Sequence, residues 1–198
     1  MASWPEPVHL TGEHSSLEPL SAAHRDDLIV AAGNGELWKL WYTSIPGPDN
    51  MDAEIGRRLD LQASGSMLPF TIRDGRGLVV GMTTYMNIDA ASKRVEIGST
   101  WTSSNVHRGP LNTECKLLLL GHAFEVLDCI AVEFRTHFFN HQSRRAIERL
   151  GAKLDGILRS HSRASNGTLR DTCVYSITLA EWPTVQAHLR WQLERPRA

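Results

Sequence analysis

The sequence predicts an α/β domain built on a mixed, mostly antiparallel twisted sheet with flanking helices. Three strand-like segments, 68–73, 78–87 and 94–101, follow one another across short turns, and such a series forms an antiparallel meander. A helical segment at 112–127 then leads to another strand at 130–136, and a helical crossover places the strands that it joins parallel. Because 198 residues fall within the usual size of one domain, we expect the whole chain to form a single unit.

The segments before the meander predict a short strand pair and two helices. Residues 10–20 alternate weakly around a turn, which is typical of an opening strand or hairpin. Ser21 is a good N-cap for a helix that reaches about Ala32 and stops at the glycines that follow. A dense aromatic segment at 36–42 and a Pro/Gly breaker separate this helix from a second one at 49–62. Aromatics at this density favour the core, with a pocket wall as the alternative.

Two later helices are predicted by apolar spacing and by their ends. In the segment 112–127, four apolar side chains recur on one stripe, which is typical of a helix that faces a sheet. The helix at 140–151 begins with a capping asparagine and ends with a glycine in the place of a left-handed stop. Two last strands, 153–163 and 170–178, flank an Asn-Gly pair, so we predict that a hairpin completes the fold.

Composition excludes several classes of partner. The chain is 41% apolar and 22% charged with a net charge of −1, so it lacks the basic excess of a nucleic-acid-binding protein. The arginine pairs at 57–58 and 144–145 are expected on solvated helix faces. The apolar runs are far shorter than the roughly 20 residues that span a bilayer, and nothing near Met1 resembles a signal peptide. Three cysteines at no metal-like spacing indicate buried thiols, so we expect a cytoplasmic protein without a nucleic-acid or membrane partner.

A basic turn joins the strand at 94–101 to the helix at 112–127. It reads His107-Arg108-Gly109-Pro110, and the helix behind it opens at Asn112. The first turn of a helix has unpaired N–H groups and a partial positive charge, so it binds anions. The pattern predicts a phosphorylated ligand.

The order of elements and three motifs resemble the GNAT family of acyl-CoA-dependent N-acyltransferases, and within it the branch of Rim-type ribosomal-protein alanine N-acetyltransferases. The motifs are Val95-Glu96-Ile97-Gly98 on a strand, Arg108-Gly109 with the run 112–116 at a helix start, and the run 140–151. The similarity covers about residues 8–182, and the third motif is the most specific. It implies acetyl-CoA as a co-substrate, in a cleft where the strand at 94–101 splays from the strand at 130–136.

The resemblance also implies how CoA lies in this cleft. The pantetheine arm pairs with the exposed edge of the first strand, and the pyrophosphate rests on N–H groups of the turn. Pro110 departs from the family pattern, because it stands where the first turn glycine lies and has no N–H to donate. We therefore expect weaker CoA binding at a retained site. The residues expected there are Ser99, Thr100, Trp101, His107, Arg108, Gly109, Asn112, Thr113, Asn140 and Arg145.

Acyl transfer from a thioester to an amine needs a base, an oxyanion site and a proton for the leaving thiolate. Glu96 is the candidate base, acting directly or through water; the alternative is a solvated carboxylate or a partner of Arg94 or Arg135. A backbone N–H near Ser99 or Thr100 is the expected oxyanion donor. Ser143 is the candidate proton donor, since the similar Rim-type enzymes have a serine at this place.

The acceptor is left open by the sequence, as a protein N-terminus, an amino acid or a small amine. Its pocket is expected at Trp38, Trp41, Tyr42 and Tyr85. We expect no metal site, because the one close histidine pair straddles a strand end and a helix start. Two functions are compatible with the residues: an acetyl-CoA-dependent N-acetyltransferase, and a non-catalytic acyl-CoA-binding or sensing protein of the same fold. Similar proteins are often dimers, so a homodimer is an expectation from the resemblance.

Overall fold

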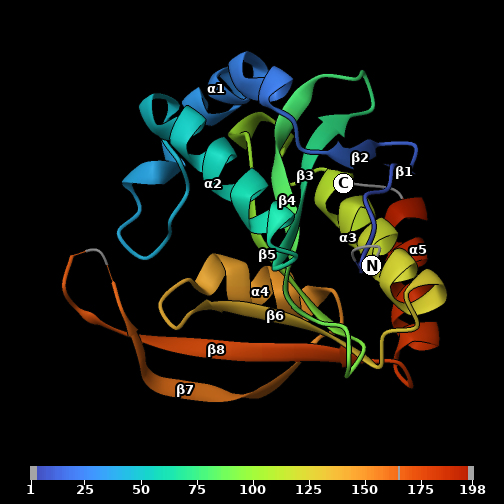
Figure 1. The fold of residues 1–198 in the computed structure, drawn as a ribbon. Coiled ribbons are helices and arrows are strands. Elements are labelled where there is room, and N and C mark those ends of the chain that lie inside the picture. The colour runs from blue at the N-terminus through green and yellow to red at the C-terminus, as the bar shows by residue number, and fades with distance from the viewer. Residues whose placement is uncertain (1–3, 165, 196–198) are drawn as a thin grey trace.

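The computed structural model describes residues 4–164 and 166–195, and its eight strands form one sheet in the order β1-β2-β3-β4-β5-β6-β8-β7 (Figure 1). Within these residues only β5 and β6 pair in parallel, and the other neighbours are antiparallel. The predicted mixed, mostly antiparallel sheet is therefore confirmed. The strands are β1 Leu10–Thr11, β2 Ser15–Pro19, β3 Met67–Asp74, β4 Val79–Asp89, β5 Arg94–Thr102, β6 Ala131–His137, β7 Lys153–Arg163 and β8 Leu169–Thr178.

Helices cover both faces of this sheet. Figure 1 shows α1 and α2 on one side of β3 to β5 and α3 on the other. Met82 and Trp101 close the core beneath α1 and α2, while Tyr85 and Phe134 belong to the larger core beneath α3 and α4. The cleft described below lies where these two layers meet. The α-helices of the described part of the chain are α1 Arg25–Gly33, α2 Met51–Ala63, α3 Leu111–Gly121, α4 His141–Arg149 and α5 Trp182–Glu194.

The parallel pair β5–β6 separates soon after it begins. Only 94–96 of β5 pair with 131–133 of β6, although β5 continues to Thr102 and β6 to His137. A bulge interrupts the pairing of β5 with β4 around Ser99, whose φ of 47° lies in the left-handed region. Bulges bend a strand and increase its twist, so β5 turns away from β6. The two strands open a gap between their carboxyl ends, as the resemblance implied.

Two helix boundaries differ from the predictions. Ser21 does cap a helical turn, through its side chain and the N–H of Ala23, but that turn is a 3₁₀ segment at Ala22–His24 and α1 starts at Arg25. The predicted helix at 112–127 is α3 followed by a π-helical turn at His122–Val126. Period-3.6 reasoning cannot detect this change, because the apolar side chains stay on the same face.

Glu114 ties the start of α3 to the turn between β1 and β2. Its carboxylate accepts hydrogen bonds from the N–H groups of Glu13 (2.9 Å) and His14 (2.7 Å) and from the hydroxyl of Ser15 (2.9 Å). A Cβ on Gly12 would lie 2.4 Å from the Glu114 carboxyl carbon, so this turn needs a glycine. The contact fixes the N-terminal end of α3, where the predicted anion-binding turn lies.

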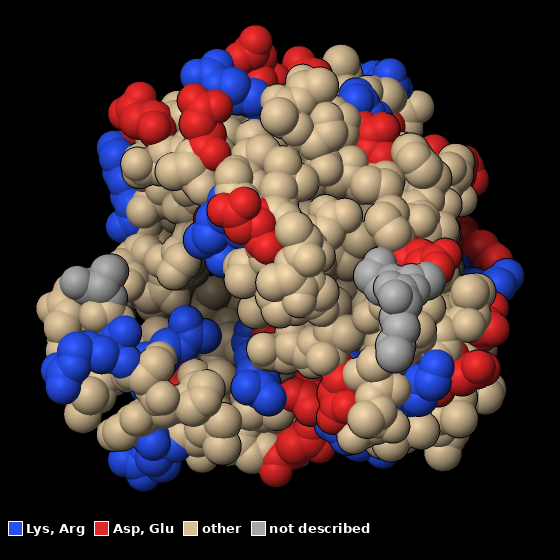
Figure 2. Space-filling model, in the orientation of Figure 1, with Lys and Arg blue, Asp and Glu red and all other residues tan. Residues whose placement is uncertain are grey.

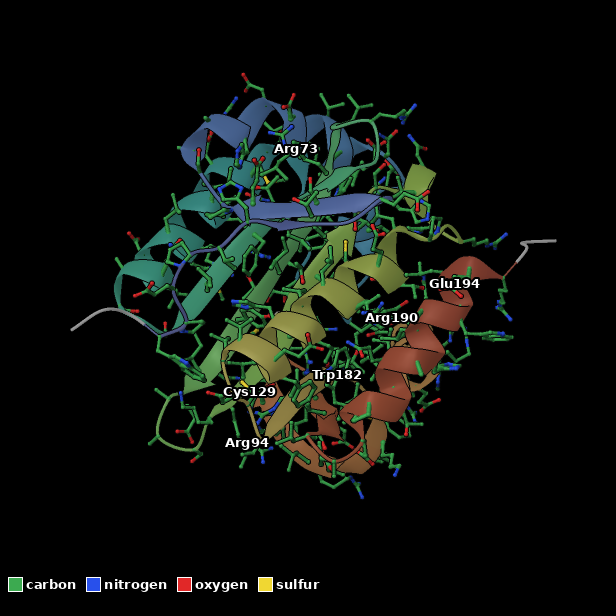
Figure 3. The ribbon with its side chains drawn as sticks, turned by 90° about the vertical axis from the view of Figure 1, so that its right-hand side faces the viewer. Arg73, Arg94, Cys129, Trp182, Arg190 and Glu194 are labelled. Carbon is green, nitrogen blue, oxygen red and sulfur yellow. The ribbon has the colours of Figure 1, made fainter. Side chains whose placement is uncertain are left out.

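The C-terminal helix α5 is absent from the sequence prediction, which ended with the β7–β8 hairpin. Trp182, Val185 and Leu189 are buried in the core that α3 shares, and Figure 3 shows α5 lying along α3 with Trp182 at their junction. The Trp182 ring stacks on the Phe124 ring with 5.4 Å between the ring centroids, and its Nε1 donates a hydrogen bond to the Glu125 carboxylate. The described residues include no helix with the length and apolar character that crossing a bilayer requires.

Candidate active site

A cleft of about 1190 Å³ opens where β5 and β6 diverge. Its walls come from both strands, the loop at 37–45, the turn at 106–109, the starts of α3 and α4, and the β7–β8 hairpin. Figure 2 shows its mouth as a hollow below α2 and above β8, with Lys and Arg side chains along the lower edge. Ligand sites of enzymes are commonly concave and of this order of size.

The cleft lining carries an excess of cationic side chains although the chain has a net charge of −1. Among the described residues that line it, Glu96 is the one carboxylate, against seven Lys and Arg side chains. A concave surface of one charge focuses the field on a ligand of the opposite charge, so this cleft suits a polyanion. The cations are Arg58, Arg108, Lys116, Arg135, Arg149, Arg170 and Arg195.

The predicted anion-binding turn lies at one end of this cleft. Arg108 adopts a left-handed φ of 61°, and the ring Nε2 of His107 lies 3.1 Å from the carbonyl oxygen of Thr102. The N–H groups of Gly109, Leu111, Asn112 and Thr113 form no hydrogen bond with any described residue, and they remain available to a ligand. Pro110 itself is the N-cap of α3 and does not line the cleft; its carbonyl accepts the N–H of Glu114 at 3.0 Å.

Arg58 holds the bulge in β5. The guanidinium donates to the carbonyl oxygen of Ser99 (3.0 Å) and to the hydroxyl of Thr84 (3.3 Å), and it pairs with Glu54 at 2.7 Å. Arg58 is 1% exposed, so the prediction of a solvated helix face at 57–58 is wrong for this residue. Its spacing of three from Ile55 places it on the inner face of α2, which was the signal that sequence reasoning missed. The contact orients the backbone next to the expected oxyanion donors.

Glu96 is a buried carboxylate rather than a solvated one. It is 5% exposed, accepts a hydrogen bond from Asn87 at 2.6 Å and lies 3.5 Å from Arg135, whereas Arg94 pairs with Glu133 instead. Burial raises the pKa of Glu96, which makes it a stronger base than an exposed glutamate. A Cβ on Gly98 would lie 2.9 Å from Oε1, so the glycine of this motif leaves room for the carboxylate.

Ser143 lies in the first turn of α4 and lines the cleft from the side opposite α1 and α2. The predicted cap is present, because Asn140 Oδ1 accepts the Ser143 N–H at 3.0 Å. The Ser143 hydroxyl forms no hydrogen bond with the residues that the structure describes. Gly151 ends the helical region with a φ of 99°, as expected for a left-handed stop. The serine is thus held by its backbone and presents a free hydroxyl to the cleft.

Comparison with known proteins agrees with this geometry. Residues 16–153 match the family model described as the acetyltransferase (GNAT) domain. The chain belongs to the GNAT acetyltransferase family. Over 106 residues it is 29% identical to YdaF, a candidate ribosomal N-acetyltransferase of Bacillus subtilis (strain 168). This match covers 54% of the chain and 57% of YdaF, a little over half the length of that relative.

Solved GNAT structures resemble the whole chain. A GCN5-related N-acetyltransferase from Brucella melitensis is 31% identical, with a TM-score of 0.86, and the match covers 96% of this chain and 86% of that one. A candidate acetyltransferase from T. thermophilus is 32% identical, with a TM-score of 0.84, over 96% and 99% of the two chains. RimJ of Mycobacterium smegmatis, solved with CoA-disulfide, is 20% identical at a TM-score of 0.78 over 97% of each chain, which shows a shared fold.

Most residues expected at the CoA site of this GNAT domain do line the cleft, but Arg145 does not. It is exposed on α4, and Arg149, one turn later, lines the cleft instead, where it donates to Thr113 Oγ1 at 3.0 Å. A role of Arg145 in CoA binding stays a prediction. The expected residues that line the cleft are Ser99, Thr100, Trp101, His107, Arg108, Gly109, Asn112, Thr113 and Asn140.

Three of the four aromatic residues expected in the acceptor pocket are not among the described residues that line the cleft. Tyr85 is fully buried, and its hydroxyl donates to the carbonyl oxygen of Leu119. Trp38 packs against Gly47, and Trp41 is 49% exposed at the edge of an aromatic group with His137. Tyr42 alone of the four lines the cleft. Tyr85 was misplaced because strand alternation turns it toward α3, away from the acceptor side.

Lys116 is a cleft residue that sequence reasoning missed. It is 6% exposed on α3, and its Nζ donates to Thr100 Oγ1 (2.9 Å) and Thr83 Oγ1 (3.3 Å) without an ion pair to any described carboxylate. Burial lowers the pKa of its amine from 10.5 to about 8. Its place one turn before Leu120, on the apolar stripe, was the available signal. A buried lysine of this kind adds positive charge to the cleft from within α3.

Proposed function

We propose that this protein transfers an acetyl group from acetyl-CoA to a primary amine by direct attack in a ternary complex. One observation carries the proposal: a single cleft through the sheet joins an anion-binding turn, a buried carboxylate and a free serine hydroxyl. Membership of the GNAT family supports acetyl transfer as the reaction. The match to YdaF favours a protein N-terminus among the acceptors, with a free amino acid or small amine as the alternatives.

The described residues fit CoA. The free N–H groups at 109–113 and the Arg108 guanidinium would hold the pyrophosphate, with Lys116 adding charge from below. Beyond Glu96, the edge of β5 that faces β6 has no strand partner, and an extended pantetheine amide chain can add to such an edge. When bound, acetyl-CoA supplies an activated acyl group as its thioester.

The candidate base and the candidate proton donor approach the cleft from opposite faces of the sheet. Val95 and Ile97 point into the core beneath α3, so Glu96, which alternates with them, points to the opposite face, toward α1 and α2. Ser143 belongs to α4 and approaches from the other face. An amine that enters from the α1–α2 side therefore meets Glu96 first, and the thioester lies between this carboxylate and the serine.

Each residue then has one task. Glu96 takes a proton from the ammonium, directly or through a water, and the neutral nitrogen attacks the carbonyl carbon. Backbone N–H groups near Ser99 and Thr100, oriented by Arg58, stabilise the negative charge that develops on the carbonyl oxygen. After the C–N bond has formed, the nitrogen loses its second proton to solvent and the C–S bond breaks. The Ser143 hydroxyl gives its proton to the departing sulfur and regains one from solvent.

Incubation with acetyl-CoA labelled in the acetyl group and a panel of amines tests the proposal. We expect the label to move to at least one amine, with one free CoA thiol released per acetyl group transferred. Thermal-shift measurements with CoA run in parallel. A CoA-induced shift without transfer to any amine would favour the non-catalytic binding or sensing protein, and the absence of both would contradict either function.

A further inference from the structure

One face of the cleft carries a polar cluster contributed by β6, β7 and β8. Phe134 points into the core beneath α3 and α4, so Arg135 and His137, on the alternate positions of β6, point toward α1 and α2. Residues paired across neighbouring strands lie on the same face of the sheet. Thr172 of β8 pairs with His137, and Glu96 of β5 pairs with Glu133 of β6, so Thr172 and Glu96 also lie on this face. We call His137, His161, Arg170 and Thr172, which all line the cleft, the β8 cluster.

Arg170 is held in this cluster by one nitrogen and leaves the others free. Its Nε donates to Thr172 Oγ1 at 3.1 Å, and the same hydroxyl lies 3.2 Å from Nδ1 of His161. The terminal nitrogens Nη1 and Nη2 form no hydrogen bond and no ion pair within the described chain. An arginine fixed through Nε presents a planar pair of donors, which is the geometry that binds a carboxylate.

His137 adds a donor that has no partner. The ring is 3% exposed, and its Nδ1 accepts the N–H of Phe139 at 3.1 Å, so the proton of the neutral ring belongs on Nε2. Nε2 is buried and has no hydrogen-bond partner among the residues described. Burial, and next the charge of Arg170, lower the pKa of His137, which favours this neutral form. Buried donors are normally paired, so an orphan that lines a cleft indicates a ligand atom.

The candidate base lines the same cleft and shares the sheet face of these donors. Glu96 is the one carboxylate among the described lining residues, and its charge and that of Arg170 act on each other. The acceptor side therefore offers a negative group for an ammonium and a positive group for an anion. A zwitterionic ligand matches both ends.

We propose that the β8 cluster binds a carboxylate that the acceptor carries close to its reacting amine. This inference rests on the proposed acetyl transfer and specifies its acceptor class. The carboxylate belongs either to a free amino acid or to an acidic side chain next to the N-terminus of a peptide. A simple alkyl amine lacks the group that satisfies Arg170 and His137.

Acceptor pairs that differ only in this group test the inference. Free amino acids are compared with their carboxamides, and peptides with an acidic second residue are compared with peptides that have the matching amide. Each pair is measured twice, as calorimetric affinity for the CoA-saturated protein and as kcat/KM with acetyl-CoA. The proteins are the wild type, Arg170→Met, Arg170→Lys and the control Arg159→Met. Arg159 lies on the same hairpin, pairs with Asp171 at 2.9 Å and does not line the cleft.

We expect the wild type to prefer the carboxylate member of at least one pair. Arg170→Met should reduce that preference about tenfold or more, the usual effect of losing a hydrogen bond to a charged group, while Arg170→Lys keeps part of it and Arg159→Met all of it. Amidation also lowers the pKa of the amine and therefore changes its reactivity with every protein. The decisive quantity is the change in the carboxylate-to-amide preference from the wild type to the variant. Unfolding midpoints within a few degrees of the wild type show that each variant is folded.

The possible results separate this inference from the proposed function. Transfer without any preference for a carboxylate, an equal preference in Arg170→Met, or a loss of CoA affinity in that variant would overturn the inference and leave acetyl transfer standing. A carboxylate preference in binding, lost in Arg170→Met but without transfer by the wild type, would support the inference and overturn the proposed function.

Discussion

Replacing Lys116 by methionine should stabilise the fold at neutral pH. The ammonium group of Lys116 is buried, and its partners are the hydroxyls of Thr83 and Thr100 rather than a carboxylate. These two hydroxyls also bond to each other at 2.7 Å, so removal of the amine leaves neither of them without a partner. Methionine has a similar length and no charge, and it fits irregular apolar space.

The size of the effect follows from the pKa. Burial lowers the pKa of the Lys116 amine from 10.5 to about 8, and each unit corresponds to about 1.4 kcal/mol. Below pH 8 the amine is charged in both states and the folded protein carries the full cost, about 3 kcal/mol. Between pH 8 and 10.5 the unfolded chain still binds the proton that the folded protein has released, so stability rises with pH. By pH 9.5 the cost has fallen to about 1.5 kcal/mol.

Urea denaturation of wild type and Lys116→Met at pH 7 and pH 9.5 measures this difference. We expect the variant to be more stable at pH 7 by about 3 kcal/mol, and the difference to shrink by about half at pH 9.5. Lys39→Met is the matched control, because it removes the same charge from a side chain that is 64% exposed. A variant that is less stable at pH 7, or a difference that does not change with pH, would refute the reasoning.

Three further predictions concern Glu96, Ser143 and Tyr85. Glu96→Gln should lower kcat/KM about 100-fold and remove the acidic limb of the pH–rate profile. Because burial raises the pKa of Glu96, the wild-type rate should begin to fall at a higher pH than an ordinary glutamate would give. An acidic limb that is unchanged in the variant would exclude Glu96 as the base. Ser143→Ala should lower kcat about tenfold or more with CoA affinity within about twofold, and an unaltered kcat would remove its assigned role. Tyr85→Phe should lower the free energy of unfolding in urea by about 1 kcal/mol, because the hydroxyl donates to the carbonyl oxygen of Leu119 in the core. The acceptor KM should not change, and a raised KM would show that Tyr85 does contact the acceptor.

Sequence patterns predicted the sheet well because its strands follow one another along the chain. Short turns and alternating side chains located β3, β4 and β5, and the helical crossover located the parallel β6. The C-terminal helix was missed although Pro183 in its first turn is a helix-start signal. Its burial depends on the distant surface of α3. The bulge at Ser99 was missed for a similar reason, since a buried arginine from α2 holds that backbone.

The candidate site was predicted where a motif and a local cap coincide. The basic turn and the N-cap Asn140 follow from local chemistry. Residues 107–109, 112, 113 and 140 line the cleft. Tyr85 and Arg145 do not line the cleft, because strand and helix phase direct their side chains elsewhere. Lys116, Arg58 and Arg170 were missed because an isolated charged residue gives no sign of which side chains from other elements surround it.

A crystal structure with bound acetyl-CoA would show directly whether the cofactor lies between β5 and β6. We expect electron density for the pyrophosphate on the N–H groups at 109–113, for pantetheine along the free edge of β5, and for the acetyl group between Glu96 and Ser143. Density for the cofactor outside the gap between β5 and β6, or an acetyl group remote from both side chains, would contradict this expectation.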